Sequence, residues 1–249
     1  MPAARPPATN AVPGFRPSTH GLRFRNAFPP GPTLTLGGFD PRRVGFGDAS
    51  AGLCGGMALT TRDLYEAGVA PPREELPPAN GSPRFRSLVR RQVESLDWFR
   101  VPLRYLDLQA LRPDPPRGLA LRLRREPPRV EALLHEWPRI RAEIDAGRLV
   151  VVGLIRAAGW SPWLLTRNHQ VLAYAYEQRA DGVTIRVYDP NHPGRDDVAL
   201  EVLLGSAETL ATPAVPLRDR IAMRQSTGEP LLGFFRQPYP PPRSVRAWR

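Results

Sequence analysis

The fold is decided by one stretch of the sequence, HQVLAYAYEQRADGVTIRVYD at residues 169–189. Apolar residues recur at every second position on both sides of Asp181-Gly182, a pair that is typical of tight hairpin turns. The period of two predicts two antiparallel strands joined by that turn. Because His169 begins the first strand and Asp189 ends the second, the hairpin should bring both residues to the same open edge of one face.

The pattern around this hairpin predicts an α+β domain. Upstream, apolar residues spaced three and four apart predict helices at Cys54–Ala67, Phe85–Phe99 and Val130–Ala146, the last one kinked near Pro138. The period of two predicts further strands at 149–156, 198–204 and 231–235. Helices followed by a run of antiparallel strands are typical of the α+β class.

Composition suggests where this domain begins and ends. Residues 1–30 are rich in Pro, Gly, Ala and Arg, so we expect a flexible arm without chemistry. Residues 31–237 should form the folded domain, and residues 238–249 should form a Pro-rich tail. A total of 249 residues suits a single domain.

All 35 basic residues are arginine, against 24 acidic residues, which gives a formal net charge of +11. Such a charge ordinarily favours a nucleic acid or an anionic membrane as partner. The absence of lysine and the 31 prolines, however, resemble the coding bias of a GC-rich genome. We therefore expect no nucleic-acid partner, and no apolar run is long enough to predict a membrane span.

The single cysteine limits both the compartment and the chemistry. One thiol cannot form an internal disulfide, and the first residues lack the apolar run of a signal peptide, so we expect a cytoplasmic protein. Cys54 lies in GLCGGMA, residues 52–58, where a loop should pass into a helix. Unpaired N–H groups and the helix dipole at such a junction favour the thiolate, the reactive form of cysteine.

A thiolate nucleophile needs a base, and the base needs an acceptor that orients it. His169 and Asp189 could fill these roles, with Asn191 as a rival orienting residue just beyond Pro190. The histidines and carboxylates show no compact metal-ligand spacing, so we expect neither a metal nor a cofactor. A buried structural cysteine and an ordinary Asp-Pro turn are the alternatives.

Three segments together carry a family resemblance: Gly52 to Met57, Asn168 to Tyr174, and Val187 to Asn191. They resemble papain-like cysteine peptidases of the bacterial Cys-His-Asp type, and are similar to the bacteriocin-processing peptidase domains of ABC exporters. The resemblance implies a nucleophile-bearing helix packed on an antiparallel sheet. It also implies that Cys54 is the nucleophile, His169 the base and acid, and Asp189 the orienting acceptor.

One position departs from that family. Six residues before the nucleophile, papain-like enzymes usually carry a Gln whose amide completes the oxyanion hole, whereas this chain has Asp48. An ionised Asp cannot donate a hydrogen bond. A backbone N–H of Cys54 or Gly55, or the side chain of Asn168, could substitute, and Trp163 could form a wall of the cleft.

These residues predict a thiol-dependent hydrolase that cleaves a peptide, isopeptide or other amide bond through an acyl-enzyme on Cys54. Two alternatives stay open. An acyltransferase of the arylamine acetyltransferase or transglutaminase type uses a similar order of residues, and an inactive papain-like module could bind an acidic partner through its arginines. The sequence does not predict the substrate or the oligomeric state.

Overall fold

The computed structural model describes residues 8–30, 52–97, 100–110, 126–159, 161–205 and 216–249. These residues form a mixed structure of helices and antiparallel sheet, so the α+β class is confirmed. No helix in the described ranges is both long and apolar enough to cross a bilayer. The position of Asp48 lies outside the described residues.

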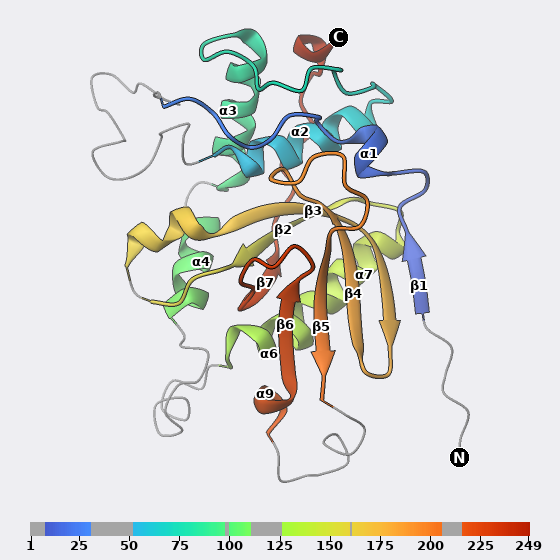
Figure 1. Ribbon diagram of the computed structural model, residues 1–249, viewed down its shortest axis with the longest axis vertical. Helices are drawn as coiled ribbons and strands as arrows, with labels where there is room; N and C mark the ends of the chain where they lie inside the picture. The colour runs from blue at the N-terminus through green and yellow to red at the C-terminus, as the bar shows by residue number, and fades with distance from the viewer. Residues whose placement is uncertain (1–7, 31–51, 98–99, 111–125, 160, 206–215) are drawn as a thin grey trace.

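The sheet is antiparallel with the order β6-β5-β4-β3-β2-β7, and β1 pairs with the second half of β3 beside β2 (Figure 1). The strands are β1 (Ala8–Ala11), β2 (Val150–Ile155), β3 (His169–Arg179), β4 (Gly182–Tyr188), β5 (Ala199–Leu204), β6 (Ile221–Gln225) and β7 (Gly233–Arg236). The predicted hairpin is therefore present, whereas β1 and β6 were not predicted.

The β3–β4 hairpin closes tightly, with Arg179 paired to Gly182 across a two-residue turn. Gly182 leaves room for the next strand, because a Cβ there would lie 2.2 Å from the carbonyl oxygen of Val202. At the other end, Leu172 pairs with Tyr188. The first residues of β3 thus lie beside the residues that follow β4.

Most of the helices that the spacing of apolar residues predicted are present. The longer ones are α2 (Cys54–Glu66), α3 (Pro83–Ser95), α4 (Arg100–Ala110) and α7 (Trp137–Asp145). Figure 1 shows α2 and α3 above β3, and α6 and α7 behind the sheet; α2 packs on β3 and β2. The short helices are α1 (Pro17–His20), α6 (Pro128–Glu131), η3 (Ala132–Glu136), η4 (Pro162–Arg167), α9 (Leu217–Arg220) and η5 (Arg246–Trp248).

The predicted break near Pro138 is a widened turn rather than a gap. Helical backbone continues from α6 through η3, a π-helical turn, into α7. The N–H of Trp137 reaches the carbonyl of Ala132, five residues back. Because Pro138 has no N–H, the normal ladder cannot continue at this point, and the wide turn absorbs the loss.

The prediction of a flexible N-terminal arm is wrong for residues 8–30. Strand β1 adds to the sheet, and the segment after it buries apolar side chains in two cores. Its most buried members are Val12, Phe15, Leu22, Phe24 and Phe28, at 0–6% exposed. The high Pro and Gly content determines an irregular path but does not prevent these side chains from packing.

The prediction of a Pro-rich tail at 238–249 is also wrong. Val245 and Trp248 are buried in the apolar cluster between α2, α3 and the N-terminal segment. The bends imposed by the prolines let this segment follow the outer surface of both helices. The folded domain therefore extends to the C-terminal residues.

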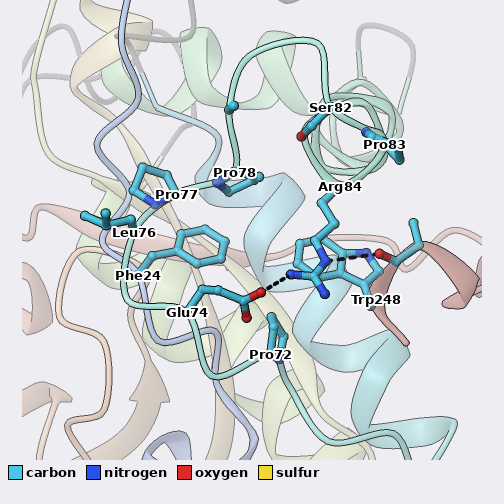
Figure 2. Close-up of a pocket in the computed structure, with 12 residues that line it drawn as sticks. Phe24, Pro72, Glu74, Leu76, Pro77, Pro78, Ser82, Pro83, Arg84 and Trp248 are labelled. Carbon is cyan, nitrogen blue, oxygen red and sulfur yellow. Dashed lines mark hydrogen bonds and ion pairs between the residues drawn. The ribbon is translucent and has the colours of Figure 1, made fainter.

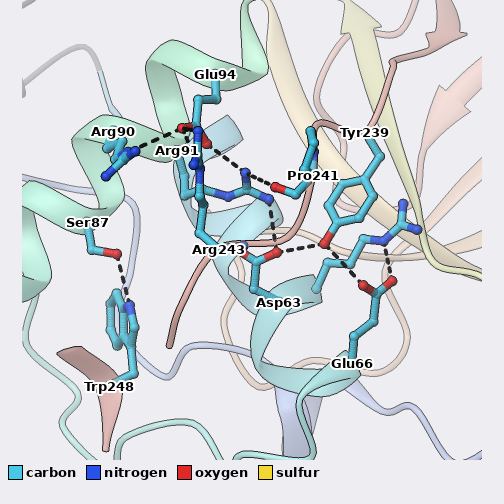
Figure 3. Close-up of polar contacts among 11 residues, drawn as sticks. Asp63, Glu66, Ser87, Arg90, Arg91, Glu94, Tyr239, Pro241, Arg243 and Trp248 are labelled. Carbon is cyan, nitrogen blue, oxygen red and sulfur yellow. Dashed lines mark hydrogen bonds and ion pairs between the residues drawn. The ribbon is translucent and has the colours of Figure 1, made fainter. Parts of the chain in front are cut away.

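A buried ion pair adds to this attachment (Figure 3). Arg91 of α3 donates to Asp63 of α2 at 2.9 Å and to the carbonyl of Pro241 at 3.2 Å. The hydroxyl of Tyr239 donates to the same carboxylate at 2.6 Å. Arg91 and Asp63 are 1% and 4% exposed, so each requires the other. The C-terminal segment is thus joined to the helix that carries Cys54.

Candidate active site

Cys54 is the first residue of α2, as predicted, and it is partly exposed. Leu53 precedes it without a capping side chain of its own; instead Asn26 accepts the N–H of Leu53 at 2.7 Å. Gln92 of α3 accepts the N–H of Gly56 at 2.9 Å. Two segments distant in sequence therefore cap this helix, and among the described residues the N–H of Cys54 has no acceptor.

The two glycines after Cys54 let neighbouring elements approach the helix closely. A Cβ on Gly56 would lie 2.3 Å from the carbonyl oxygen of Leu88 in α3. A Cβ on Gly55 would lie 2.0 Å from the amide oxygen of Gln170, which follows His169 in β3. The pair therefore brings α2 close to both α3 and the strand that carries the histidine.

His169 begins β3 and Asp189 follows the last residue of β4, and their side chains meet. His169 Nε2 lies 2.6 Å from Asp189 Oδ1, and the two residues are 4% and 0% exposed. The strand register explains the contact: Tyr188 pairs with Leu172, so Asp189 lies diagonally across from His169 on the same face. Because a carboxylate only accepts, Nε2 carries the proton; the imidazole also interacts with Cys54, and Nδ1 is the ring nitrogen that Asp189 leaves free for it.

Asp189 has further partners on both of its carboxylate oxygens. Gln225 donates from Nε2 to Oδ2 at 2.7 Å, and the N–H of Asn191 donates to Oδ1 at 2.8 Å. The guanidinium of Arg156, which follows β2, lies 3.8 Å from Oδ2. Gln225 ends β6, a strand that the sequence pattern did not indicate, and nothing local to Gln225 or Arg156 pointed to this role.

A second group of residues holds His169 from α4, which was also not predicted. The hydroxyl of Tyr105 donates to the carbonyl oxygen of His169 at 2.7 Å. Gln109 accepts from the side chain of Asn168 at 2.9 Å. Both α4 residues are buried, so the backbone at the start of β3 is fixed on either side of the imidazole.

The electrostatics couple the three groups. Burial alone would raise the pKa of Cys54, but the hydrogen bond and charge of His169 and the N–H groups of Gln170 and Gly55 lower it below its ordinary value. Burial opposes protonation of His169, yet Asp189 and then Cys54 raise its pKa to about 9. Burial is likewise outweighed at Asp189, where His169 lowers the pKa well below its usual range. This arrangement favours a thiolate–imidazolium pair at neutral pH.

The remaining predicted site residues fall into different environments. The side chain of Asn168 is held in place, because its amide nitrogen donates to Gln109 at 2.9 Å and its oxygen accepts the N–H of Arg156 at 3.1 Å. Asn191 does not reach the imidazole; its side chain accepts from Asn26 at 3.1 Å. The N–H of Gly55 contributes to lowering the pKa of Cys54. Asp48 and the side chain of Trp163 lie outside the described residues.

In the part of the chain that the structure describes, no three His, Cys, Asp or Glu residues are grouped closely enough to hold a metal ion.

Several basic side chains of α3 are already neutralised within the protein: Arg84 pairs with Glu74, Arg90 with Glu94, and Arg91 with both Asp63 and Glu94. Such pairs reduce the charge that this face could offer to an acidic partner.

A cavity of about 480 Å³ opens at the start of α3 (Figure 2). Phe24, Trp248 and the Leu76-Pro77-Pro78 segment line it, and Arg84 crosses it to reach Glu74 and the carbonyl of Ala247. None of its lining residues belongs to the cluster around Cys54. The cavity is therefore a separate feature.

No protein-family model, curated protein or solved structure matches this chain. Cys54, His169 and Asp189 are thus interpreted from their own geometry and charge.

Proposed function

We propose that this protein is a thiol-dependent hydrolase with a papain-like arrangement, cleaving a peptide, isopeptide or other amide bond through an acyl-enzyme on Cys54. The observation that carries the proposal is the chain of contacts from the Cys54 sulfur through the imidazole of His169 to the carboxylate of Asp189. A nucleophile, a base and an orienting acceptor in contact are the minimum that such chemistry requires.

In the proposed reaction, the Cys54 thiolate attacks the carbonyl carbon of the amide. The negative charge that develops on the carbonyl oxygen is stabilised by the N–H of Cys54 at the positive end of α2. The imidazolium of His169 donates its proton to the leaving amine as the C–N bond breaks. Neutral His169 then removes a proton from water as the water oxygen attacks the thioester carbon, the C–S bond breaks, and Cys54 leaves as the thiolate, which releases the acid product and restores the thiolate–imidazolium pair.

Asp189 supports both protonation states of His169. Its Oδ1 accepts from Nε2, which directs the opposite ring nitrogen to the sulfur, and its charge stabilises the imidazolium. The buried position of Asp189 keeps water from screening that charge.

The test is cleavage of a mixed peptide pool in water enriched in oxygen-18, with and without an added primary amine. Hydrolysis should place the heavy oxygen in new carboxyl ends, and Cys54→Ala should abolish this label while Cys54→Ser retains at most a trace. Transfer of acyl groups to the amine instead of water would reassign the activity to an acyltransferase. No product with either acceptor, together with an unreactive thiol, would refute the proposal and favour a binding module.

A further inference from the structure

The buried carboxylate of Asp189 is held by two residues that do not touch His169. Gln225 lies at the end of β6 and is 2% exposed, and the side chain of Arg156, just beyond β2, is 11% exposed. Arg156 Nη2 donates to Gln225 Oε1 at 2.7 Å, and Gln225 Nε2 donates to Asp189 Oδ2 at 2.7 Å. Three elements that are separated in the sheet thus meet at one carboxylate.

This chain of contacts has only one workable orientation. A guanidinium can only donate and a carboxylate can only accept, so the Gln225 amide must turn its oxygen to Arg156 and its nitrogen to Asp189. With Oδ2 occupied in this way, Oδ1 is the oxygen that faces His169. Without Arg156, the amide oxygen would be buried without a donor, a state that costs free energy and favours rotation of the amide.

We propose that Arg156 and Gln225 are positioning residues for the reaction proposed above, forming a brace that fixes the Asp189 carboxylate so that Oδ1 stays on His169. The inference rests on the proposed function, since it assigns these residues a role in the same site. Arg156 acts through Gln225, and Gln225 acts through Asp189.

The charged and titratable groups around the imidazole define what a pH measurement reports. Cys54 faces it from α2 and Asp189 from the end of β4, while Tyr105 of α4 contacts only its backbone carbonyl. Arg156 approaches from the end of β2, and its positive charge by itself disfavours the imidazolium. Simple charge removal should therefore raise the pKa of His169, whereas loss of the brace should lower it because Oδ1 moves away.

These opposite directions allow a decisive test. Iodoacetate is an anion, so its reaction with Cys54 is fastest while His169 is protonated, and the rate should fall as pH passes the histidine pKa near 9. We expect Gln225→Leu and Arg156→Met to shift this fall in rate to lower pH by about one pH unit. Arg156→Lys should give a smaller shift, between that of the unmodified protein and that of Arg156→Met. Arg148→Met, an exposed arginine just before the other end of β2 that pairs with the partly buried Glu143, should leave the fall in rate in place.

Thermal melting shows which variants are folded. If Arg156→Met does not fold, the shift measured for Gln225→Leu alone tests the brace. A shift to higher pH, or none, would overturn the brace. If the unmodified protein itself shows no falling limb, the proposed function fails, which separates the two outcomes.

Discussion

Replacing Asp189 with Asn should remove most of the stabilisation of the imidazolium while keeping the shape of the side chain. Burial lowers the pKa of His169, and Asp189 is the largest influence that raises it to about 9. The difference from the ordinary value of 6.5 corresponds to roughly 3 kcal/mol, since one pKa unit is worth about 1.4 kcal/mol. The Cys54 thiolate supplies part of this energy, so we expect a loss on the order of 10²-fold in amide turnover at neutral pH.

The assay compares Asp189→Asn with Asn191→Ala, two changes in the same loop. The side chain of Asn191 contacts Asn26 rather than the imidazole, so its loss should reduce turnover by less than about tenfold. In Asp189→Asn the falling limb of the iodoacetate rate should also move to a markedly lower pH, because burial of the imidazole is then opposed by Cys54 alone among the two groups that raise the pKa of His169. Full turnover in Asp189→Asn, or a larger loss in Asn191→Ala, would refute this reasoning.

Three further predictions concern stability. Gly56→Ala should lower the free energy of unfolding by about 1–3 kcal/mol in urea, because its Cβ would meet the backbone of α3; a gain, as helix propensity alone favours, would contradict that packing. Arg91→Met should cost about 3–5 kcal/mol by leaving Asp63 buried without its partner, while Arg90→Met, whose side chain is 65% exposed, should cost under about 1 kcal/mol; similar costs would argue against the buried pair. Deleting residues 1–28 should abolish cooperative melting, since five large apolar side chains there are buried. An unchanged melting curve would show that this segment is a flexible arm after all.

Periodicity and local chemistry were enough to predict the parts of the fold that depend on neighbours in sequence. The hairpin at 169–189, the helix that begins at Cys54 and the contact between His169 and Asp189 follow from apolar alternation and a two-residue turn. Asp189 and Asn191 share the same strand parity, and Asp189 was favoured as the neighbour of the imidazole because Asn191 lies beyond Pro190, where the strand was expected to end. That preference agrees with the observed distances.

Composition misled where Pro and Gly were taken as signs of disorder. The N-terminal and C-terminal segments lack regular periodicity because each buries single side chains, such as Phe24 and Trp248, from an irregular backbone. Such isolated contacts leave no repeating signal. The short strands β1 and β6 were missed for the same reason, and Gln225 with them.

The supporting residues of the site depend on tertiary packing alone. Arg156, Gln225 and Tyr105 come from three different elements and meet only when the sheet is assembled. The capping of α2 by Asn26 and Gln92 is equally nonlocal. No spacing rule relates these positions, so only the structure could reveal them.

The most direct test of the account is the pH dependence of Cys54 alkylation by iodoacetamide, a neutral reagent that reports the thiolate. Cys54 is the only cysteine in the chain, so one mass increment measures its reaction without ambiguity. We predict an inflection well below the free-cysteine value of about 8.5, and its return toward that value in His169→Ala. An inflection at or above about 8.5, identical in both proteins, would show that Cys54 is a structural thiol and would contradict the proposed nucleophile.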